Sequence, residues 1–280
     1  MTLRRHVLFA LLAASATPAF AQDQQPLPSP EEINGANGVT IAGGGGIIPD
    51  YEGSDEYKWI PAAAIRGKVG TISFSTRGLY LYVDLVGGSG KVDFDVGPIA
   101  GVRFNRTGKI KDALVNLLPD RKTAIEVGGF AGVSFKGLTN PYDSLGVRLD
   151  VVHDIANAHK STVFSPNVEF STPLSRSVYV VATASADFVS NRFADYYFTV
   201  SPAEATLSGL PAFNAGGGMK NWKLGMLANY SLSGDLRHGL SLFGLGNYSR
   251  LVGDFKRTPI VSQRGSAGQW LGAIGLAYTW

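Results

Sequence analysis

The side chains best suited to chemistry are the histidines and their acidic neighbours. His153 directly precedes Asp154, and His159 follows shortly after in the same stretch. A histidine oriented by a carboxylate can serve as a general base, and two histidines close in sequence are potential metal ligands. With a membrane-facing serine, His153 would fit a lipid-modifying enzyme. We favour another interpretation, in which the two histidines occupy a strand end and a polar loop, both at the water interface.

Four carboxylates lie close together in one stretch nearer the amino terminus: Asp50, Glu52, Asp55 and Glu56. Carboxylate oxygens are the ligands that calcium prefers, so this stretch is a candidate site for a divalent cation. An acidic loop exposed to water has the same composition and needs no metal. We predict the solvated loop, and therefore no metal site.

The glycine-rich stretches do not fit nucleotide binding. Gly43–Gly46 is followed by apolar residues and a proline instead of a helix, which excludes a dinucleotide-binding turn. Gly90-Lys91 and Gly108-Lys109 lack the full pattern of a phosphate-binding loop. The chain has no cysteine, which excludes disulfides, thiolate ligands, cysteine nucleophiles and a lipoprotein anchor. The sequence therefore predicts a protein that is not an enzyme, with no catalytic residue and no cofactor.

The first residues are typical of an export signal. Arg4 and Arg5 precede a short apolar stretch, and a small-residue cleavage pattern ends at Ala21. We predict cleavage after Ala21, which removes residues 1–21. Residues 22–36 are rich in proline and polar side chains, so they are expected to form a flexible periplasmic leader. The remainder, 37–280, is expected to be a single folded domain.

Charge excludes one class of partner. The 280 residues have 25 basic and 22 acidic side chains, and removal of the two signal arginines leaves 23 against 22. A nearly neutral chain lacks the clustered positive charge that nucleic acids require. We therefore expect no nucleic-acid partner.

Period-two alternation of apolar and polar residues recurs after residue 37, and no apolar run is long enough for a spanning helix. Alternating blocks of about 9 to 11 residues match tilted strands that cross a bilayer. The blocks lie at 58–66, 70–86, 92–105, 124–136, 145–151, 162–171, 177–189, 222–232, 239–251 and 269–280. This pattern predicts an all-β protein.

The polar faces of these blocks combine small residues with charges. A soluble sandwich would place bulky solvated side chains there, whereas a narrow barrel lumen favours glycine, alanine and charges that pair across it. We predict a transmembrane antiparallel β-barrel of the bacterial outer membrane with 12 strands. The range is 10 to 14, because 70–86 forms one bent strand or two and 192–200 is a strand or part of a loop. The candidate lumen-facing charges are Asp93, Asp95, Arg103, Glu126, Arg148, Asp150, Asp187 and Lys223.

The last block has an apolar face that ends at the carboxyl terminus. It consists of Trp270, Ile274, Leu276, Tyr278 and Trp280. A terminal aromatic residue on such a strand resembles the signal that the outer-membrane barrel assembly machinery reads. We therefore expect this machinery and outer-membrane lipid as partners. Interfacial aromatic girdles are expected at Tyr51, Tyr57, Trp59, Tyr142, Tyr196, Tyr197, Trp222, Trp270 and Trp280.

Connection lengths divide the loops into two groups. The long connections 48–57, 106–122, 190–210 and 252–266 are expected outside the cell. The short turns at 172–176 and 233–238 are expected in the periplasm.

Four stretches of the chain resemble the MipA/OmpV family of outer-membrane proteins. They are Pro49–Tyr57 with Pro61, Ser75–Leu79, Tyr197–Ser201 with Ala205 and Ser208–Pro211, and Leu251–Asp254 with Thr258–Val261. Phe255 and Thr258 differ from the usual pattern of the last stretch, and 106–122 is more basic than the family pattern.

This resemblance implies an outer-membrane barrel. For the member that gives the family its name, it implies a scaffold between a murein lytic transglycosylase and a murein synthase, with no catalytic residues. Two alternatives remain: a small passive channel with the charged residues in its lumen, and a lipid-modifying enzyme that uses His153.

Overall fold

A computed structural model of the chain describes residues 38–88 and 90–280, which form a closed antiparallel barrel of twelve strands. The predicted fold class and strand number are confirmed. The proposed signal peptide, its cleavage after Ala21 and the leader 22–36 lie outside the described residues.

Each strand pairs with its neighbours in chain order, and the first pairs with the last. The strands are β1 (Gly38–Pro49), β2 (Tyr57–Val69), β3 (Ile72–Arg77), β4 (Tyr80–Asp84), β5 (Val92–Arg103), β6 (Ala124–Lys136), β7 (Ser144–Asp154), β8 (Thr162–Pro173), β9 (Val178–Val189), β10 (Gly218–Ser231), β11 (Gly239–Leu251) and β12 (Gly268–Thr279). The 70–86 block is thus a hairpin of two short strands.

Backbone pairing between β1 and β12 closes the barrel. The register runs from Thr40 opposite Thr279 to Ile47 opposite Gly272, and the two threonine hydroxyls lie 2.8 Å apart. Gly44 lies in this seam, where a methyl group would be 2.1 Å from the carbonyl oxygen of Ile274. The glycine run therefore allows the first and last strands to approach closely enough to pair.

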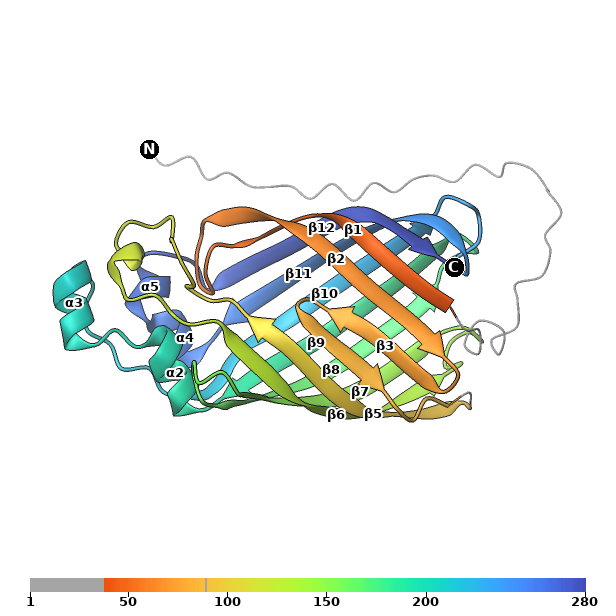
Figure 1. Ribbon diagram of the computed structural model, residues 1–280, viewed down its shortest axis with the longest axis horizontal. Coiled ribbons are helices and arrows are strands. Elements are labelled where there is room, and N and C mark those ends of the chain that lie inside the picture. The colour runs from red at the N-terminus through yellow and green to blue at the C-terminus, as the bar shows by residue number, and fades with distance from the viewer. Residues whose placement is uncertain (1–37, 89) are drawn as a thin grey trace.

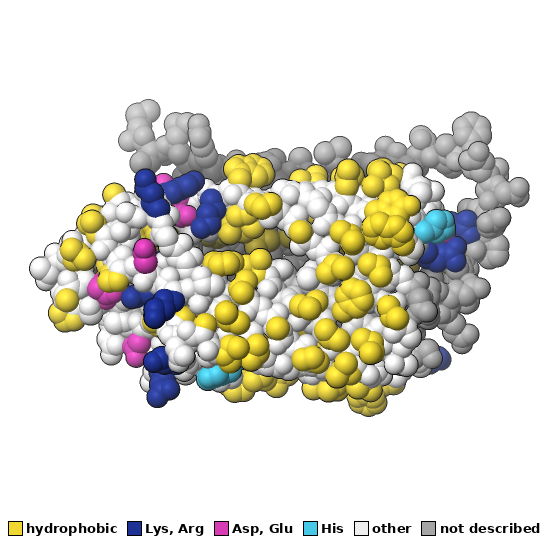
Figure 2. Space-filling model, viewed as in Figure 1, with side chains coloured by type: hydrophobic (Ala, Val, Ile, Leu, Met, Phe, Trp, Pro, Cys, Tyr) yellow, Lys and Arg dark blue, Asp and Glu magenta, His cyan; other side chains and the backbone are white. Residues whose placement is uncertain are grey.

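The outer surface of the barrel is apolar. Large exposed side chains include Trp59, Met226 and Ile274, and Figure 2 shows a broad band of hydrophobic side chains over the strands on the face in view. Charged side chains lie mainly on the inner face or beyond the band. This arrangement is that of a barrel that spans a membrane, with hydrocarbon on its outer face.

The two ends of the barrel differ (Figure 1). One end, called the turn end, has short turns, the start of β1 and the carboxyl terminus. The other end, called the loop end, carries the long connections and the helices α2 (Asn191–Phe198), α3 (Pro202–Ser208), α4 (Gly253–Arg257) and α5 (Pro259–Ser262), with the 3-10 helix η1 (Val115–Leu117). None of the described helices has the length and hydropathy needed to cross a membrane.

The connections at the loop end fold together into a cap, defined as residues 50–56, 104–123, 155–161, 190–217 and 252–267. The cap has an apolar core that includes Tyr51, Ile110, Val115, Leu118, Phe193, Tyr197, Phe198, Leu210, Phe255 and Ile260. One sequence expectation is therefore wrong. Tyr51 and Tyr197 are buried in the cap and belong to no girdle. Of the two alternatives for 192–200, the structure selects the connection, most of which is the helix α2.

The β3–β4 hairpin leaves part of β2 without a partner strand. β3 pairs with β2 only from Arg66 to Val69, and the hairpin turns at Gly78, whose φ is +59°. Figure 1 shows β2 and β5 continuing past the hairpin toward the loop end. No described strand pairs with this edge of β2 from residue 57 to 65.

Some backbone groups on this open edge of β2 have side-chain partners or need none. The hydroxyl of Thr76 accepts a bond from the Ile65 N–H at 3.0 Å. Because successive residues direct their backbone groups to opposite sides, Pro61 faces the same edge as Ile65, and proline has no N–H to leave unpaired. At the loop end, Lys111 Nζ donates to the Tyr57 carbonyl. The edge is thus partly satisfied without a strand.

We predict that Gly44→Ala weakens the closing seam, since the new methyl group would collide with β12 backbone. The free energy of unfolding should fall by about 1–3 kcal/mol, the usual cost of overpacking. Urea unfolding in detergent, followed by tryptophan fluorescence, measures it. The control is Gly43→Ala, because a methyl group there meets nothing within 4 Å. Equal stability of the two variants would contradict the prediction.

Candidate functional site

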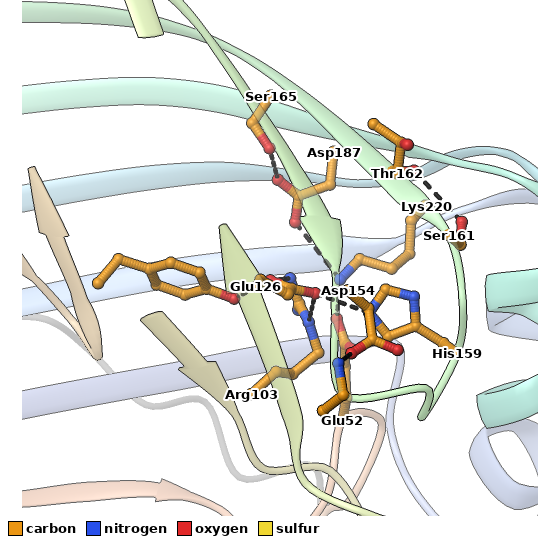
Figure 3. Close-up of polar contacts among 12 residues, drawn as sticks. Glu52, Arg103, Glu126, Asp154, His159, Ser161, Thr162, Ser165, Asp187 and Lys220 are labelled. Atoms are coloured by element: carbon orange, nitrogen blue, oxygen red, sulfur yellow. Dashed lines mark hydrogen bonds and ion pairs between the residues drawn. The ribbon is translucent and has the colours of Figure 1, made fainter. Parts of the chain in front are cut away.

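A fully buried carboxylate lies at the centre of the candidate site, beneath the cap. Glu126 on β6 has no exposed surface. Arg103 Nε donates to its Oε1 at 2.9 Å and Arg103 Nη2 to its Oε2 at 3.1 Å. His159 Nε2 lies 2.8 Å from the same Oε1, and the Tyr80 hydroxyl donates to Oε2. Three strands and one cap loop thus meet at this carboxylate (Figure 3).

A second buried carboxylate, Asp187 on β9, lies beside the first cluster (Figure 3). It accepts hydrogen bonds from Lys223 Nζ and Ser165 Oγ, each at 2.8 Å. Lys220 Nζ is 3.4 Å from Asp187 and also pairs with Glu52 of the cap. Two lysines and two carboxylates therefore neutralise one another where the wall meets the cap.

Lys220 reaches this cluster because of an irregularity in β10. Strict alternation from the inward Asn221 and Lys223 would direct Lys220 outward. The pairing register with β9 shifts between Met219 and Asn221. A bulge adds one residue on one strand and redirects the side chain, so Lys220 is buried, with 1% of its surface exposed.

The helix α2 rests on this charged layer. Phe193 and Tyr197 are fully buried, and their rings pack against each other with centroids 4.9 Å apart. The Arg103 guanidinium lies 5.4 Å from the Phe193 ring centre, and Lys220 Nζ lies 5.2 Å from it. Aromatic faces attract cations, most strongly away from water. The cap is therefore held by both apolar packing and the charges below it.

A further set of polar contacts lies deeper in the lumen. Arg148 Nε donates to Asp150 at 2.6 Å, and the Tyr82 hydroxyl donates to the same carboxylate at 3.0 Å. Arg77 on β3 pairs with Glu169 on β8, although these strands are far apart in the sheet order. This ion pair spans the lumen, so the interior is crossed by side chains.

Toward the turn end the remaining inward charges form their own contacts. Lys136 Nζ lies 2.8 Å from Asp93, and the Ser134 hydroxyl donates to Asp95 at 2.7 Å. The structure thus places all eight predicted lumen charges on inward faces. It groups Arg103 with Glu126, Arg148 with Asp150, and Asp187 with Lys223, while Asp93 and Asp95 lie apart from the cluster under the cap.

His153 and His159 lie in different environments. His153 is exposed on the outer side, with Nδ1 2.9 Å from the Thr162 hydroxyl. His159 is buried against Glu126, so its expected place at the water interface is wrong. Asp154 accepts hydrogen bonds from the backbone N–H groups of Ala156 and Lys160 and thereby orders the loop. The described hydrogen bonds do not join His153 to Asp154, and the carboxylate that pairs with His159 is Glu126.

The acidic stretch is only partly solvated, which corrects the expectation of a solvated loop. Asp55 and Glu56 are exposed, but Asp50 is buried and Glu52 pairs with Lys220. Asp50 accepts a hydrogen bond from the Lys111 N–H at 2.8 Å. Among residues 38–88 and 90–280, no three histidine or carboxylate side chains are grouped to hold a metal ion.

The aromatic terminal strand faces outward. All five residues of the predicted assembly signal are exposed: Trp270, Ile274, Leu276, Tyr278 and Trp280. The Tyr278 and Trp280 rings pack with centroids 4.7 Å apart at the turn end.

One cation in the cap is unusual. Arg106 is 3% exposed, and none of its guanidinium nitrogens has a hydrogen-bond partner among the described residues. Burial, followed by the nearby Arg121, lowers the pKa of Arg106 to about 10. Burial also raises the pKa of the Tyr197 hydroxyl well above its ordinary value. The cap therefore keeps water away from polar groups.

Two important residues of the site could not have been found from the alternating pattern. Glu52 and His159 come from cap loops, where no periodic pattern exists to indicate which side chains turn inward. The arrangement as a whole contains buried, mutually neutralised charges. Chemically it is suited to holding a cap on a barrel.

Comparison with known families gives one match across nearly the whole described chain. A family model described as "MltA-interacting protein MipA" matches residues 41–280. No curated protein matches the sequence.

Three solved structures are similar in outline. An outer membrane channel from Pseudomonas putida F1 is 10% identical, with 94% of this chain and 100% of that chain covered and a TM-score of 0.44. The anion-selective porin from Comamonas acidovorans is 10% identical, with 86% and 74% covered and a TM-score of 0.35. The translocator domain of autotransporter NalP from Neisseria meningitidis is 14% identical, with 88% and 89% covered and a TM-score of 0.34.

We predict that Glu126→Gln destabilises the barrel by about 3 kcal/mol, because removing one partner of a buried ion pair leaves the other charge uncompensated. Arg103 and His159 would both lose their carboxylate. Thermal unfolding in detergent measures the loss. Glu169→Gln is the matched control, since its carboxylate is about a third exposed and its pair with Arg77 should contribute at most about 1 kcal/mol.

A pH-dependent prediction concerns the turn-end connection at 137–143. The Asp143 carboxylate accepts from the Thr139 hydroxyl and from the N–H groups of Leu138, Thr139 and Asn140. These bonds, the Thr139 hydroxyl first, lower the pKa of Asp143 to about 2. A depressed pKa stabilises the fold above the unfolded value of 3.8 and ceases to do so as the pH falls toward 2.

Carbon-13 NMR titration of the Asp143 carboxyl should give a midpoint near 2, and Thr139→Val should raise it. A midpoint near the ordinary aspartate value of about 4 would contradict this.

Proposed function

The chain belongs to the MipA family, and from that premise we propose that it is a non-enzymatic scaffold of the bacterial outer membrane. In this proposal the barrel anchors the protein, and the turn end binds murein enzymes in the periplasm. The family description supports it, because it names an interaction with MltA.

The proposed orientation of the barrel in the membrane follows from the different lengths of the connections at its two ends. Outer-membrane barrels have short periplasmic turns and longer extracellular loops. The turn end is therefore placed in the periplasm and the cap outside the cell. An amino-terminal signal peptide cleaved after Ala21 would deliver the chain there, and the outward aromatic strand that ends at Trp280 would present it to the assembly machinery.

The observation that carries a scaffold role over a channel is the occupied interior. The cap packs its own apolar core over the Glu126 cluster. Below it, the pair between Arg77 and Glu169 crosses the lumen. A barrel filled by its own side chains favours a structural role over transport.

The proposed partners are murein-processing enzymes. The family description supports them by naming MltA, and the resemblance implies a lytic transglycosylase foremost and a murein synthase as the second member of the assembly. The surfaces within their reach are the short turns between the strands. One of these, 137–143, is held rigid by the four hydrogen bonds to Asp143. A rigid turn loses little conformational entropy when a partner binds.

Two alternatives have weaker support. A passive channel is favoured by inward side chains that remain exposed, of which Arg66 is one. A lipid-modifying enzyme would need His153 to activate a serine, but the described hydrogen-bond partner of His153 is Thr162.

The test of the scaffold is crosslinking in intact envelopes followed by purification of the barrel. We expect a murein lytic transglycosylase to be recovered, and replacement of 138–142 by a glycine-serine turn to reduce that recovery severalfold. A control replacement of the exposed cap residues Thr206 and Leu207 by glycine and serine should leave recovery unchanged.

Recovery of no murein enzyme, or equal recovery with all three proteins, would contradict the proposed turn-end partner. Planar-bilayer recordings on the same purified barrel provide the control for the channel alternative. The scaffold proposal expects no steady conductance, and a stable ion-selective conductance would favour the channel instead.

A further inference from the structure

An open groove lies on the outer wall at the loop-end rim. It is formed by the ends of β7, β8 and β9 with the start of α2, and its volume is about 600 Å³. Its lining includes His153, Lys160, Phe164, Phe188 and Arg192. We call it the rim groove. It is separate from the buried charges under the cap.

The floor of the rim groove is apolar and faces the bilayer. Phe164 and Phe188 are directly opposite each other on β8 and β9, and both are exposed. Val151 pairs with Phe164 on the next strand, and Met219 pairs with Phe188 on the other side. A lipid-facing strip thus runs across four strands and leads into the groove.

The upper part of the rim groove is cationic. Lys160 and Arg192 are exposed, and neither forms an ion pair with a described carboxylate, while His153 adds a third basic group. Asp154 accepts from backbone N–H groups of its own loop. Asp195, which follows Arg192 on α2, accepts from the Thr199 hydroxyl and lies outside the groove lining. No acidic side chain lines the groove. Figure 2 shows Lys, Arg and His side chains, with Asp and Glu among them, along the loop-end border of the apolar band.

We propose that the rim groove binds a lipid with a phosphorylated headgroup in the outer leaflet. Acyl chains lie along Phe164 and Phe188, and the phosphate lies between Lys160 and Arg192. Cations just above lipid-facing apolar surface complement a molecule that is apolar at one end and anionic at the other. A free phosphate would leave the apolar floor without a partner, so the lipid is the ligand that fits both halves.

The hydroxyl of Thr162 and its neighbour His153 border the same groove and lie within 2.9 Å of each other. They supply further polar contacts to a headgroup sugar or phosphate. The proposal depends on the orientation given above and not on the scaffold role. A failure of the murein-enzyme test would therefore leave it standing, and the reverse also holds.

The test is native mass spectrometry of the full barrel in detergent with bisphosphorylated lipid A as the probe. We expect one retained lipid and a dissociation constant about thirtyfold weaker for the double variant Lys160→Ala/Arg192→Ala, since each of the two cations near a lipid phosphate contributes about 1 kcal/mol. The matched control is Lys109→Ala/Lys256→Ala, which removes two exposed cap lysines outside the groove. That control should bind like the unaltered protein.

A second experiment distinguishes a phosphate on a lipid from free inorganic phosphate. Dephosphorylated lipid A should bind the unaltered protein and the Lys160/Arg192 variant equally weakly, and millimolar inorganic phosphate should not displace the phosphorylated lipid. Equal affinity of the unaltered protein and that variant for lipid A would overturn the proposal. An equal loss of lipid A affinity in the Lys109/Lys256 control variant would overturn it too, as would displacement of lipid A by inorganic phosphate.

Discussion

Hydrocarbon cannot hydrogen-bond to a peptide group, and this constraint shapes the whole molecule. Each strand must find partners on both edges, which for a sheet in lipid means closure. The seam between β1 and β12 meets that demand through backbone contact close enough to need Gly44. Where the β3–β4 hairpin is too short to cover β2, Pro61 removes a donor and Thr76 and Lys111 supply partners.

Closure with only twelve strands leaves a narrow interior, and the interior in turn determines which side chains are allowed there. Charges removed from water must be paired. The lumen accordingly contains Arg103 with Glu126, and Arg148 with Asp150. These pairs neutralise charge along the lumen wall.

The cap depends on the same charges. Phe193 of α2 lies over Arg103 and Lys220, while His159 and Glu52 reach down from cap loops to Glu126 and Lys220. Apolar packing alone would seal the barrel without fixing the orientation of the cap. The ion pairs add that orientation, because each joins a cap residue to a particular strand. The loop end is thus a rigid surface, and the turn end offers the short connections.

The sequence by itself determined the inward faces, the family resemblance and the strands other than β1, because alternation is a local property that needs no knowledge of distant residues. No predicted block covers β1, where the glycine run Gly43–Gly46 obscures the alternation. It placed Glu126 and Asp187 on inward faces but left the strand count between 10 and 14, since a hairpin at 70–86 has the same periodicity as one bent strand. Tertiary structure alone decided which charges meet. Lys220 turns inward only through a bulge, and His159 reaches Glu126 from a loop without periodicity. Such contacts join residues far apart in the chain, where local pattern carries no information about distance.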